Sequence, residues 1–244
     1  MTRALPSGLF RALPVRQFFV LPLLFLIQGC SNYSALSTNQ TEPAGFPSDR
    51  YQQADPNYVY PLDSEASQII VTVRRGGLMA RLGHDHIVSS NHVQGFIFLD
   101  SGSGQCTADL FVPIGMLEVD NAKLRTLAAM TTTPSAADIK GTRGNMLKSI
   151  EGEVFPFAQL HSSDCFTSVS GNKSTVELTI HGVTQQRKLD IALEQTTGDE
   201  LVISGTFSIL QSDFGITPFS IMNGLIKVED KLDLSFRLIA KKSL

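Results

Sequence analysis

The feature that most constrains this 244-residue chain is a repeated two-residue alternation of apolar and polar side chains. In "KLDLSFRLIA" (231–240), every second residue is Leu or Phe, and Asp, Ser and Arg stand between them. An extended chain turns such residues to opposite faces, so the pattern predicts antiparallel strands with one buried and one solvated face. Related patterns recur at 68–73, 93–100, 106–117, 157–164, 174–182, 187–195 and 201–210.

These eight segments predict an all-β fold with a single eight-stranded antiparallel barrel. Closing the sheet removes the exposed edges that would otherwise pair with other chains. A barrel of eight strands is either filled by its own side chains or holds one slender ligand. Only residues 119–152 break the alternation, and they predict a short helical insertion of two helices between strands three and four. Asp120 or Asn121 would cap the first helix and Ser135 the second.

The first 29 residues have the character of a signal peptide. Arg3, Arg11 and Arg16 precede the apolar run "FFVLPLLFLI" (18–27), which is too short to span a bilayer. The next stretch, "LIQGC", resembles the lipobox of bacterial lipoproteins, in which Cys30 would be the acylated residue. That resemblance implies an exported protein anchored in a membrane, and Ser31 after the cysteine suits the outer membrane, facing the periplasm. An ordinary secretory signal is the alternative.

The composition of residues 30–66 differs from that of residues 67–244. The earlier segment is rich in Ser, Asn, Gln and Pro and has no apolar periodicity, so we expect a flexible tether after the acylated cysteine. The barrel domain is then expected at 67–244. Without residues 1–29 the chain keeps 17 Lys and Arg against 23 Asp and Glu, a net charge of −6. This acidic balance argues against a nucleic-acid partner, which needs a basic face.

Two cysteines remain once Cys30 is set aside, and in an exported protein such a pair favours a disulfide. If the strand at 105–114 pairs with the strand at 157–167, Cys106 lies opposite Cys165, within reach of a bridge. Two reduced, buried cysteines are the alternative.

Four motifs in order carry a family resemblance: "EVFPFAQLHSSDC" (153–165), "LTIHGVTQQRKLDI" (178–191), "GTFSILQSDFGI" (205–216) and "VEDKLDLSFRLIA" (228–240). Together they resemble the YceI-like family, with Gln211 where that family usually has Arg. The resemblance implies a lipocalin-like barrel, exported to the periplasm, whose apolar tunnel binds a polyisoprenoid such as a quinone or polyprenyl tail.

A tunnel of this kind needs inward apolar side chains and no catalytic group. The wall residues we expect are Val71, Val73, Ile97, Leu110, Val112, Ile180, Ile191, Ile203, Phe207 and Phe236. The same residues would equally fill a solid barrel, and the sequence leaves both interpretations open. The only cofactor-like group expected is a bound isoprenoid quinone or polyprenyl lipid.

The stretch "GHDHIVSSNH" (83–92) holds three of the five histidines in the chain. His84, Asp85, His86 and His92 would form a polar mouth, where His N–H groups bind a ligand headgroup. A metal site of His84, His86 and His92 is one alternative, and a general base tuned by Asp85 is another. The histidines could also only fasten a loop. No nucleophile motif accompanies them, so we expect a binding protein and not an enzyme. The two rival functions are a periplasmic metal-binding protein and a solid barrel with a structural or stress role.

Overall fold

The computed structural model describes Met1 and residues 41–165, 173–197 and 199–242. Residues 37–244 form one compact unit, which contains its own core and disulfide. The expected signal peptide and Cys30 lie outside the described residues. Among the helices of the described part, none is both long and apolar enough to cross a membrane.

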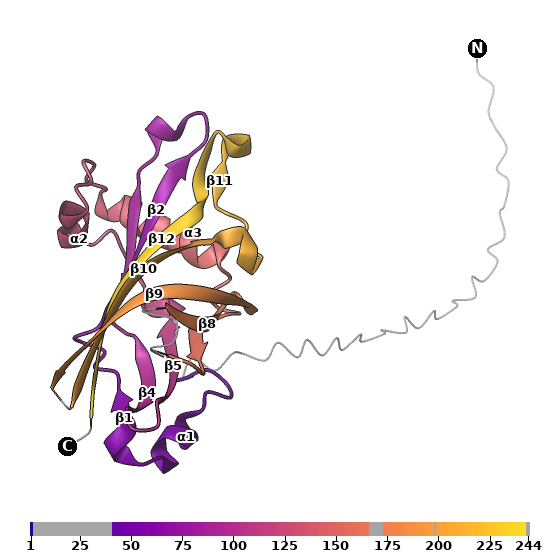
Figure 1. The fold of residues 1–244 in the computed structure, drawn as a ribbon. Helices are drawn as coiled ribbons and strands as arrows, with labels where there is room; N and C mark the ends of the chain where they lie inside the picture. Colours follow the sequence, from indigo (N-terminus) through magenta and orange to yellow (C-terminus); the bar gives the residue numbers. More distant parts are fainter. Residues whose placement is uncertain (2–40, 166–172, 198, 243–244) are drawn as a thin grey trace. The chain divides into compact units, whose positions relative to one another are not determined.

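The described residues form one antiparallel, curled sheet of twelve strands (Figure 1). Eight of them correspond to the predicted segments: β2 (Gln68–Gly76), β4 (Gln94–Asp100), β5 (Gln105–Pro113), β7 (Phe157–Ser162), β8 (Lys173–Ile180), β9 (Val183–Thr197), β10 (Glu200–Leu210) and β12 (Ile226–Lys241). The other four are β1 (Val59–Pro61), β3 (His86–Ser90), β6 (Glu118–Val119) and β11 (Ser220–Ile221). The all-β prediction is therefore confirmed.

The predicted count of eight strands is wrong, because four strands have only two to five residues. Such short segments hold too little alternation to register as a pattern, and β3 is buried at four consecutive positions. The strand order is β1-β4-β5-β7-β8-β9-β10-β12-β2-β3-β6, with β11 on β12. This path has two ends, so the sheet is curled and not a closed ring. An isolated bridge joins Leu62, which directly follows β1, to Ala240 of β12.

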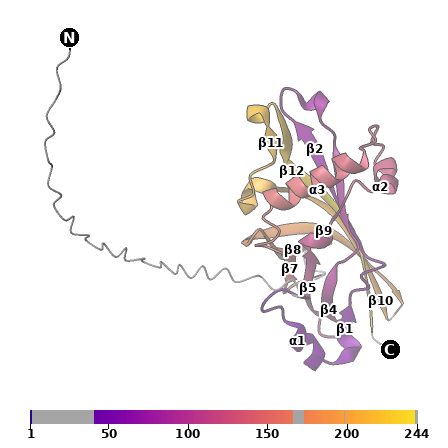
Figure 2. The same ribbon diagram turned by 180° about the vertical axis from the view of Figure 1, so that it is seen from behind.

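Turn chemistry and helix caps explain the local breaks. His181 and Gly182 both have positive φ and form the tight turn that joins β8 to β9. Two helices occupy the predicted insertion, α2 (Ala122–Leu127) and α3 (Ala136–Ser149). Asn121, and not Asp120, caps α2, and Ser135 caps α3 in a capping box with Asp138. Figure 2 shows α3 lying across one side of the curled sheet.

The expectation of a flexible tether does not hold for residues 48–66. Helix α1 (Ser48–Gln53) packs on the sheet, where the Tyr51 ring stacks on Phe96 with centroids 5.0 Å apart. Strand β1 extends the sheet by pairing with β4, and Tyr60 lies in the core. The polar composition of this segment led to the prediction of a flexible tether, because composition does not show that a few buried aromatic side chains can order a segment.

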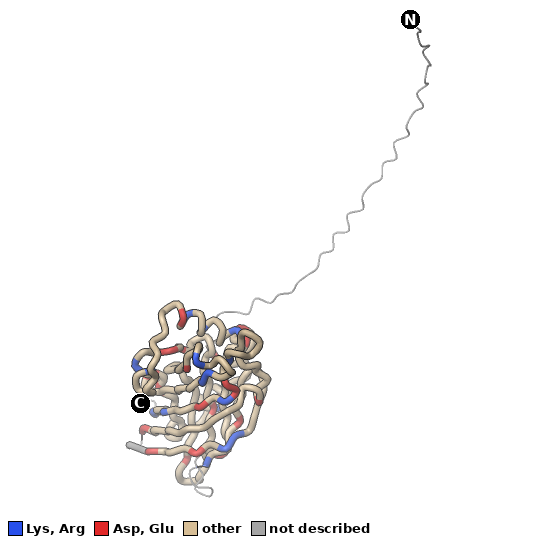
Figure 3. Tube along the Cα trace, turned by 90° about the horizontal axis from the view of Figure 1, so that it is seen from above, with Lys and Arg blue, Asp and Glu red and all other residues tan. Residues whose placement is uncertain are grey.

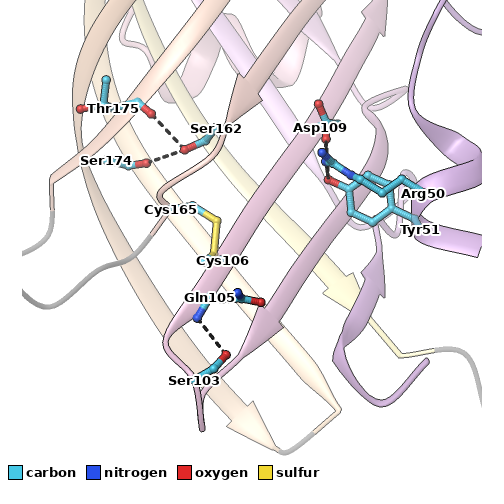
Figure 4. Close-up of a disulfide and its surroundings, with 10 residues drawn as sticks. All are labelled: Arg50, Tyr51, Ser103, Gln105, Cys106, Asp109, Ser162, Cys165, Ser174 and Thr175. Carbon is cyan, nitrogen blue, oxygen red and sulfur yellow. Dashed lines mark hydrogen bonds and ion pairs between the residues drawn. A yellow bond between two sulfur atoms is a disulfide. The ribbon is translucent and has the colours of Figure 1, made fainter. Parts of the chain in front are cut away.

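A buried carboxylate fastens α1 to β5 (Figure 4). Tyr51 donates a hydrogen bond to Asp109 at 2.5 Å, Arg50 forms an ion pair with the same oxygen, and His161 Nδ1 lies 2.7 Å from the other oxygen. Burial, the hydrogen bond to Asp109 and the charge of Asp109 raise the pKa of Tyr51 to about 12. The phenol is therefore held protonated.

The predicted disulfide between Cys106 and Cys165 is present, with Cα atoms 5.2 Å apart (Figure 4). It links β5 to the end of β7, which pair as expected. Both cysteines belong to the larger core cluster, together with Ile97, Ile191 and Ile203. Ser162 donates to the Thr175 carbonyl at 3.0 Å and joins β7 to β8 nearby. This end of the sheet is therefore packed solid.

The variant Tyr51→Phe tests the attachment of α1 to Asp109, called here the clasp, through the dependence of protein stability on alkaline pH. The folded pKa of about 12 exceeds the ordinary 10.0, so the contribution of Tyr51 to stability is complete below pH 10 and is lost as the pH rises toward 12. In urea unfolding, the wild type should lose more free energy of unfolding over this range than Tyr51→Phe. At pH 8 the variant should be less stable by about 1–2 kcal/mol. Tyr58→Phe, at an exposed position, is the control; equal alkaline losses in both variants would contradict the clasp.

Candidate functional site: an apolar cavity under α3

A cavity of about 330 Å³ lies inside the curled sheet. A core filled by its own side chains leaves few voids larger than one water, whose share of liquid volume is about 30 Å³. The cavity falls instead at the lower end of the range for small-molecule pockets, about 300–1,000 Å³. The interior is therefore hollow, and the interpretation as a solid barrel is wrong.

Most of the cavity wall comes from the inward positions of long strands. Seven of the ten expected wall residues line it: Val71, Val73, Leu110, Val112, Ile180, Phe207 and Phe236. The other three, Ile97, Ile191 and Ile203, do not line it; they are buried in the core cluster that also contains both cysteines of the disulfide. Alternation identifies the inward face of a strand, but it carries no information on where along the barrel the packing stops.

The opposite end of the cavity is covered by α3. Thr142, Asn145, Met146 and Ser149 line the cavity, although no residue of α3 is fully buried. Arg143 holds the helix in place by donating to the Gly115 carbonyl at 2.6 Å and to the Leu117 carbonyl at 3.3 Å. The helical insertion is thus the cover of the cavity.

A polar recess of about 320 Å³ adjoins the cavity at the end of α3. His181 Nδ1 lies 3.1 Å from the Phe214 carbonyl oxygen, and since a carbonyl only accepts, Nδ1 is the protonated nitrogen. The site therefore combines an apolar interior with a polar opening that the sequence did not indicate. The cavity and the recess share Asn145, Ser149 and Phe219, and the recess is completed by Lys148, Glu151, His181, Gly215 and Thr217.

The predicted polar mouth at 84–92 does not assemble as a group. Asp85 forms ion pairs with Arg74 and Arg75 outside the cavity. His92 follows the end of β3, and the four residue steps from His86 to Ser90 alone span about 13 Å. His84 does not line the cavity, and its Nδ1 is buried without a hydrogen-bond partner among the described residues. Only His86 lines the cavity.

The separation of His92 also contradicts the three-histidine metal site, because zinc ligands must all lie about 2 Å from one ion. In the part of the chain that the structure describes, no group of three or more His, Cys, Asp or Glu side chains is placed to hold a metal.

The hydrogen-bond partner of His86 is Asp120, which the sequence indicated only as a possible helix cap. His86 Nδ1 lies 2.6 Å from Asp120 Oδ2, and the carboxylate side chain is fully buried. Arg125 donates to Asp120 Oδ1 at 2.5 Å and to the Thr132 carbonyl at 2.8 Å. A carboxylate only accepts, so Nδ1 of His86 carries the proton and Nε2 is left for a ligand. The alternative of a general base tuned by Asp85 is not formed at His86, because Asp85 pairs with Arg74 and Arg75.

Electrostatics keep Asp120 ionised. Burial alone raises the pKa of a carboxyl, but hydrogen bonds from His86, the Ile87 N–H and Arg125 outweigh it and hold the pKa of Asp120 below its ordinary value. The pairing joins residues 34 positions apart, and no local motif could have indicated it. The buried charge orients the ring of His86 in a mainly apolar wall.

Gln211 is another polar wall residue, and the sequence had singled it out. It is buried, lines the cavity, and donates from Nε2 to the Glu229 carbonyl at 2.9 Å. An arginine here would place a positive charge in the wall, whereas the amide needs no counter-ion. The Gln211 amide therefore keeps this part of the wall uncharged.

A sequence profile of the YceI-like domain family matches residues 60–240. The chain belongs to the YceI-like family. Its match begins at β1, seven residues before the expected domain start. No curated protein matches the chain.

Two solved structures are similar in fold. BcnA of Burkholderia cenocepacia is 15% identical, with a TM-score of 0.51 over 74% of this chain and 99% of that one. A polyisoprenoid binding domain from Saccharophagus degradans, described as implicated in plant cell wall breakdown, is 12% identical, with a TM-score of 0.53 over 76% of this chain and 99% of that one. At such low identity these matches show the shared fold alone.

Asp120→Asn tests the buried network behind His86. The lowered folded pKa means that the stabilising contribution of Asp120 is complete above its ordinary value of 3.8 and is lost as the pH falls through the folded pKa. The variant should lose about 3–5 kcal/mol at pH 7, because Arg125 keeps a buried charge without its partner. It should also lose part of the acid sensitivity of the wild type in urea unfolding below about pH 4. Asp100→Asn, in an exposed turn, is the control; a cost equal to the control would contradict the network.

Proposed function

We propose that this protein is an exported, lipid-anchored binding protein that holds an isoprenoid-like molecule, a quinone or a polyprenyl lipid, in the cavity under α3. The cavity is the observation that carries the proposal, because its wall is built mainly from Val, Leu, Ile and Phe. Burying about 400 Å² of a prenyl chain would contribute on the order of 10 kcal/mol before the costs of association. No catalytic group is required for this.

The similarity to the polyisoprenoid binding domain of Saccharophagus degradans supports this choice of ligand. Its fold is shared, and the residues that line the present cavity have the chemistry that a prenyl chain needs. Unlike a metal ion, a branched hydrocarbon is bound by contact area alone, and the apolar wall supplies that area.

The headgroup of such a ligand would lie beneath α3, where the polar wall residues gather. Neutral His86 can accept a hydrogen bond from a hydroxyl at Nε2, and the protonated ring can donate one to a quinone carbonyl. The buried carboxylate of Asp120 fixes the ring orientation in both states. A ligand with an oxygen-bearing head and an apolar tail fits this arrangement.

Lipid anchoring and the outer-membrane location rest on the sequence before the described residues. The lipobox-like "LIQGC", the acylation of Cys30 that it implies and Ser31 support them. Residues 31–47 would then connect the anchor to α1, which the Asp109 cluster clasps to the sheet. In this arrangement the domain stays near a membrane that contains prenyl lipids.

Val71→Phe should reduce ligand binding, because the larger ring enters the cavity from β2. Native mass spectrometry of the purified wild type, with extraction of bound lipid, should detect a co-purifying prenyl lipid, and the variant should carry roughly tenfold less. Val154→Phe makes the same change at an exposed position and should bind as the wild type does. Wild-type protein without prenyl lipid, but with stoichiometric zinc or copper, would contradict the proposal.

His86→Leu separates headgroup binding from tail binding. Loss of one hydrogen bond should weaken binding of a short-chain ubiquinone roughly five- to tenfold, with squalene, which has no polar head, unaffected. Leu234→Met, a change of similar volume in the same cavity wall, is the control. Fluorescence competition with a hydrophobic dye measures both ligands. Equal effects of His86→Leu on quinone and squalene would argue against a headgroup contact.

A further inference from the structure

Two loops meet at the end of the domain that is uppermost in Figures 1 and 2. One is "GGLMARLG" (76–83), between β2 and β3, and the other is "FSIMNGLIK" (219–227), which includes β11. We call residues 76–83 and 219–227 the apolar tip. Met79 N–H donates to the Leu225 carbonyl at 2.8 Å, and Gly76 pairs with Lys227. The two loops are therefore one surface.

The apolar tip presents large hydrophobic side chains to water. Leu78 is 89% exposed, Leu82 58%, Met222 57% and Ile221 44%. Single exposed apolar residues are ordinary, but several on adjoining loops form a patch of the kind that marks an interaction with a partner or a membrane.

The backbone of the tip holds these side chains outward. Met222, Asn223 and Gly224 are three successive residues with positive φ, at 52°, 54° and 85°. A methionine in this region is uncommon and persists only where the surroundings fix it. Gly77 also has a positive φ, and a Cβ there would lie 2.5 Å from the Leu225 carbonyl oxygen. The loops are thus locked together, with Met222 presented at the end of a tight turn.

The charged side chains of the two loops themselves are both basic, but the carboxylate of Glu229 lies against Gly76 at the edge of the tip. Neither loop contains Asp or Glu, although the chain has 23 acidic residues in all. Arg81 and Lys227 have no ion-pair partner among the described residues, whereas Arg74 and Arg75 below the tip are engaged by Asp85. Over the rest of the domain, basic and acidic residues are interspersed (Figure 3). Exposed apolar side chains flanked by Arg81, and by Lys227 with Asp230 in its electrostatic range, match the interface of an anionic lipid bilayer.

The tip adjoins the cavity. Phe219, its first residue on the second loop, lines both the cavity and the polar recess. Val228 comes directly after the tip, lines the cavity, and donates its N–H to the Phe219 carbonyl at 2.8 Å. A bilayer in contact with the tip would therefore lie next to the opening of the cavity.

We infer that the apolar tip docks on the surface of an anionic lipid bilayer, with Leu78, Leu82, Ile221 and Met222 entering the acyl boundary and Arg81 and Lys227 binding lipid headgroups. This contact is separate from the Cys30 anchor, and α1, which continues from the tether, lies at the other end of the domain in Figures 1 and 2. The docked protein could load or unload its ligand directly at the bilayer. The contact itself needs no particular ligand.

The test uses the oxidised compact unit, residues 37–244, which lacks Cys30, and vesicles without prenyl lipid. Flotation should recover the protein with vesicles of phosphatidylcholine and phosphatidylglycerol. Recovery should fall at high salt and be weak with phosphatidylcholine alone. Leu78→Asp and Met222→Asp should each weaken binding roughly tenfold. Arg81→Glu and Lys227→Glu should each weaken it at least fivefold.

Leu127→Asp is the matched control, since Leu127 is 73% exposed outside the tip, and it should bind vesicles as the wild type does. Circular dichroism confirms the fold of each variant. Three outcomes would overturn the inference: no recovery with anionic vesicles, equal loss with Leu127→Asp and Leu78→Asp, or a dimer in light scattering that Leu78→Asp dissociates. In each case the co-purification of a prenyl lipid is measured separately, so that a failure of membrane docking can be distinguished from a failure of the proposed ligand binding.

Discussion

The structure depends on the long antiparallel ladder formed by β9, β10, β12 and β2. Strands β10 and β12 pair without interruption from Glu200 opposite Lys241 to Leu210 opposite Lys231. A slip of one residue in this register would turn every inward side chain to solvent. Phe207 on β10, together with Leu234 and Phe236 on β12, faces the cavity because this register holds. Both the hollow interior and its apolar character result from it.

Within this frame the two ends of the interior differ. The disulfide between Cys106 and Cys165 and the isoleucines around it close one end. At the other end, α3 lines the cavity without burying a residue completely. A fully packed core would exclude a ligand, and a fully open sheet would expose the apolar wall to water. The combination leaves a space that one elongated apolar molecule could occupy.

Two buried aspartates connect the irregular segments to the sheet. The Asp109 carboxylate accepts hydrogen bonds from Tyr51 and His161 and forms an ion pair with Arg50. These contacts attach the N-terminal helix α1 to β5. The Asp120 carboxylate accepts hydrogen bonds from His86 and Arg125. These contacts attach the helical insertion to β3. A buried carboxylate is tolerated only with several donors around it, so each pairing also fixes the geometry of its surroundings. In the second case it places a polar nitrogen at the wall of an apolar cavity.

How much was predictable from sequence depended on the range of the interactions involved. Alternation is a local property, and it was enough for the eight long strands and for seven wall residues. The bridge between Cys106 and Cys165 was predicted only on the condition that their two strands pair. The order of the four motifs was enough to predict membership of the YceI-like family. The strands of two to five residues, the docking of Tyr51 and the solid packing of Ile97, Ile191 and Ile203 were not predictable, because neighbours distant in sequence decide them.

The histidine-rich stretch shows the same division. The order of residues alone established that polar, titratable side chains stand beside an apolar barrel. Three-dimensional packing decides that, of these side chains, His86 alone lines the cavity. His92 lies beyond the other end of β3, and Asp85 forms ion pairs with Arg74 and Arg75. The apolar tip likewise exists only in three dimensions, since its two loops are more than 130 residues apart in sequence and are joined by the pairing of β2 with β12.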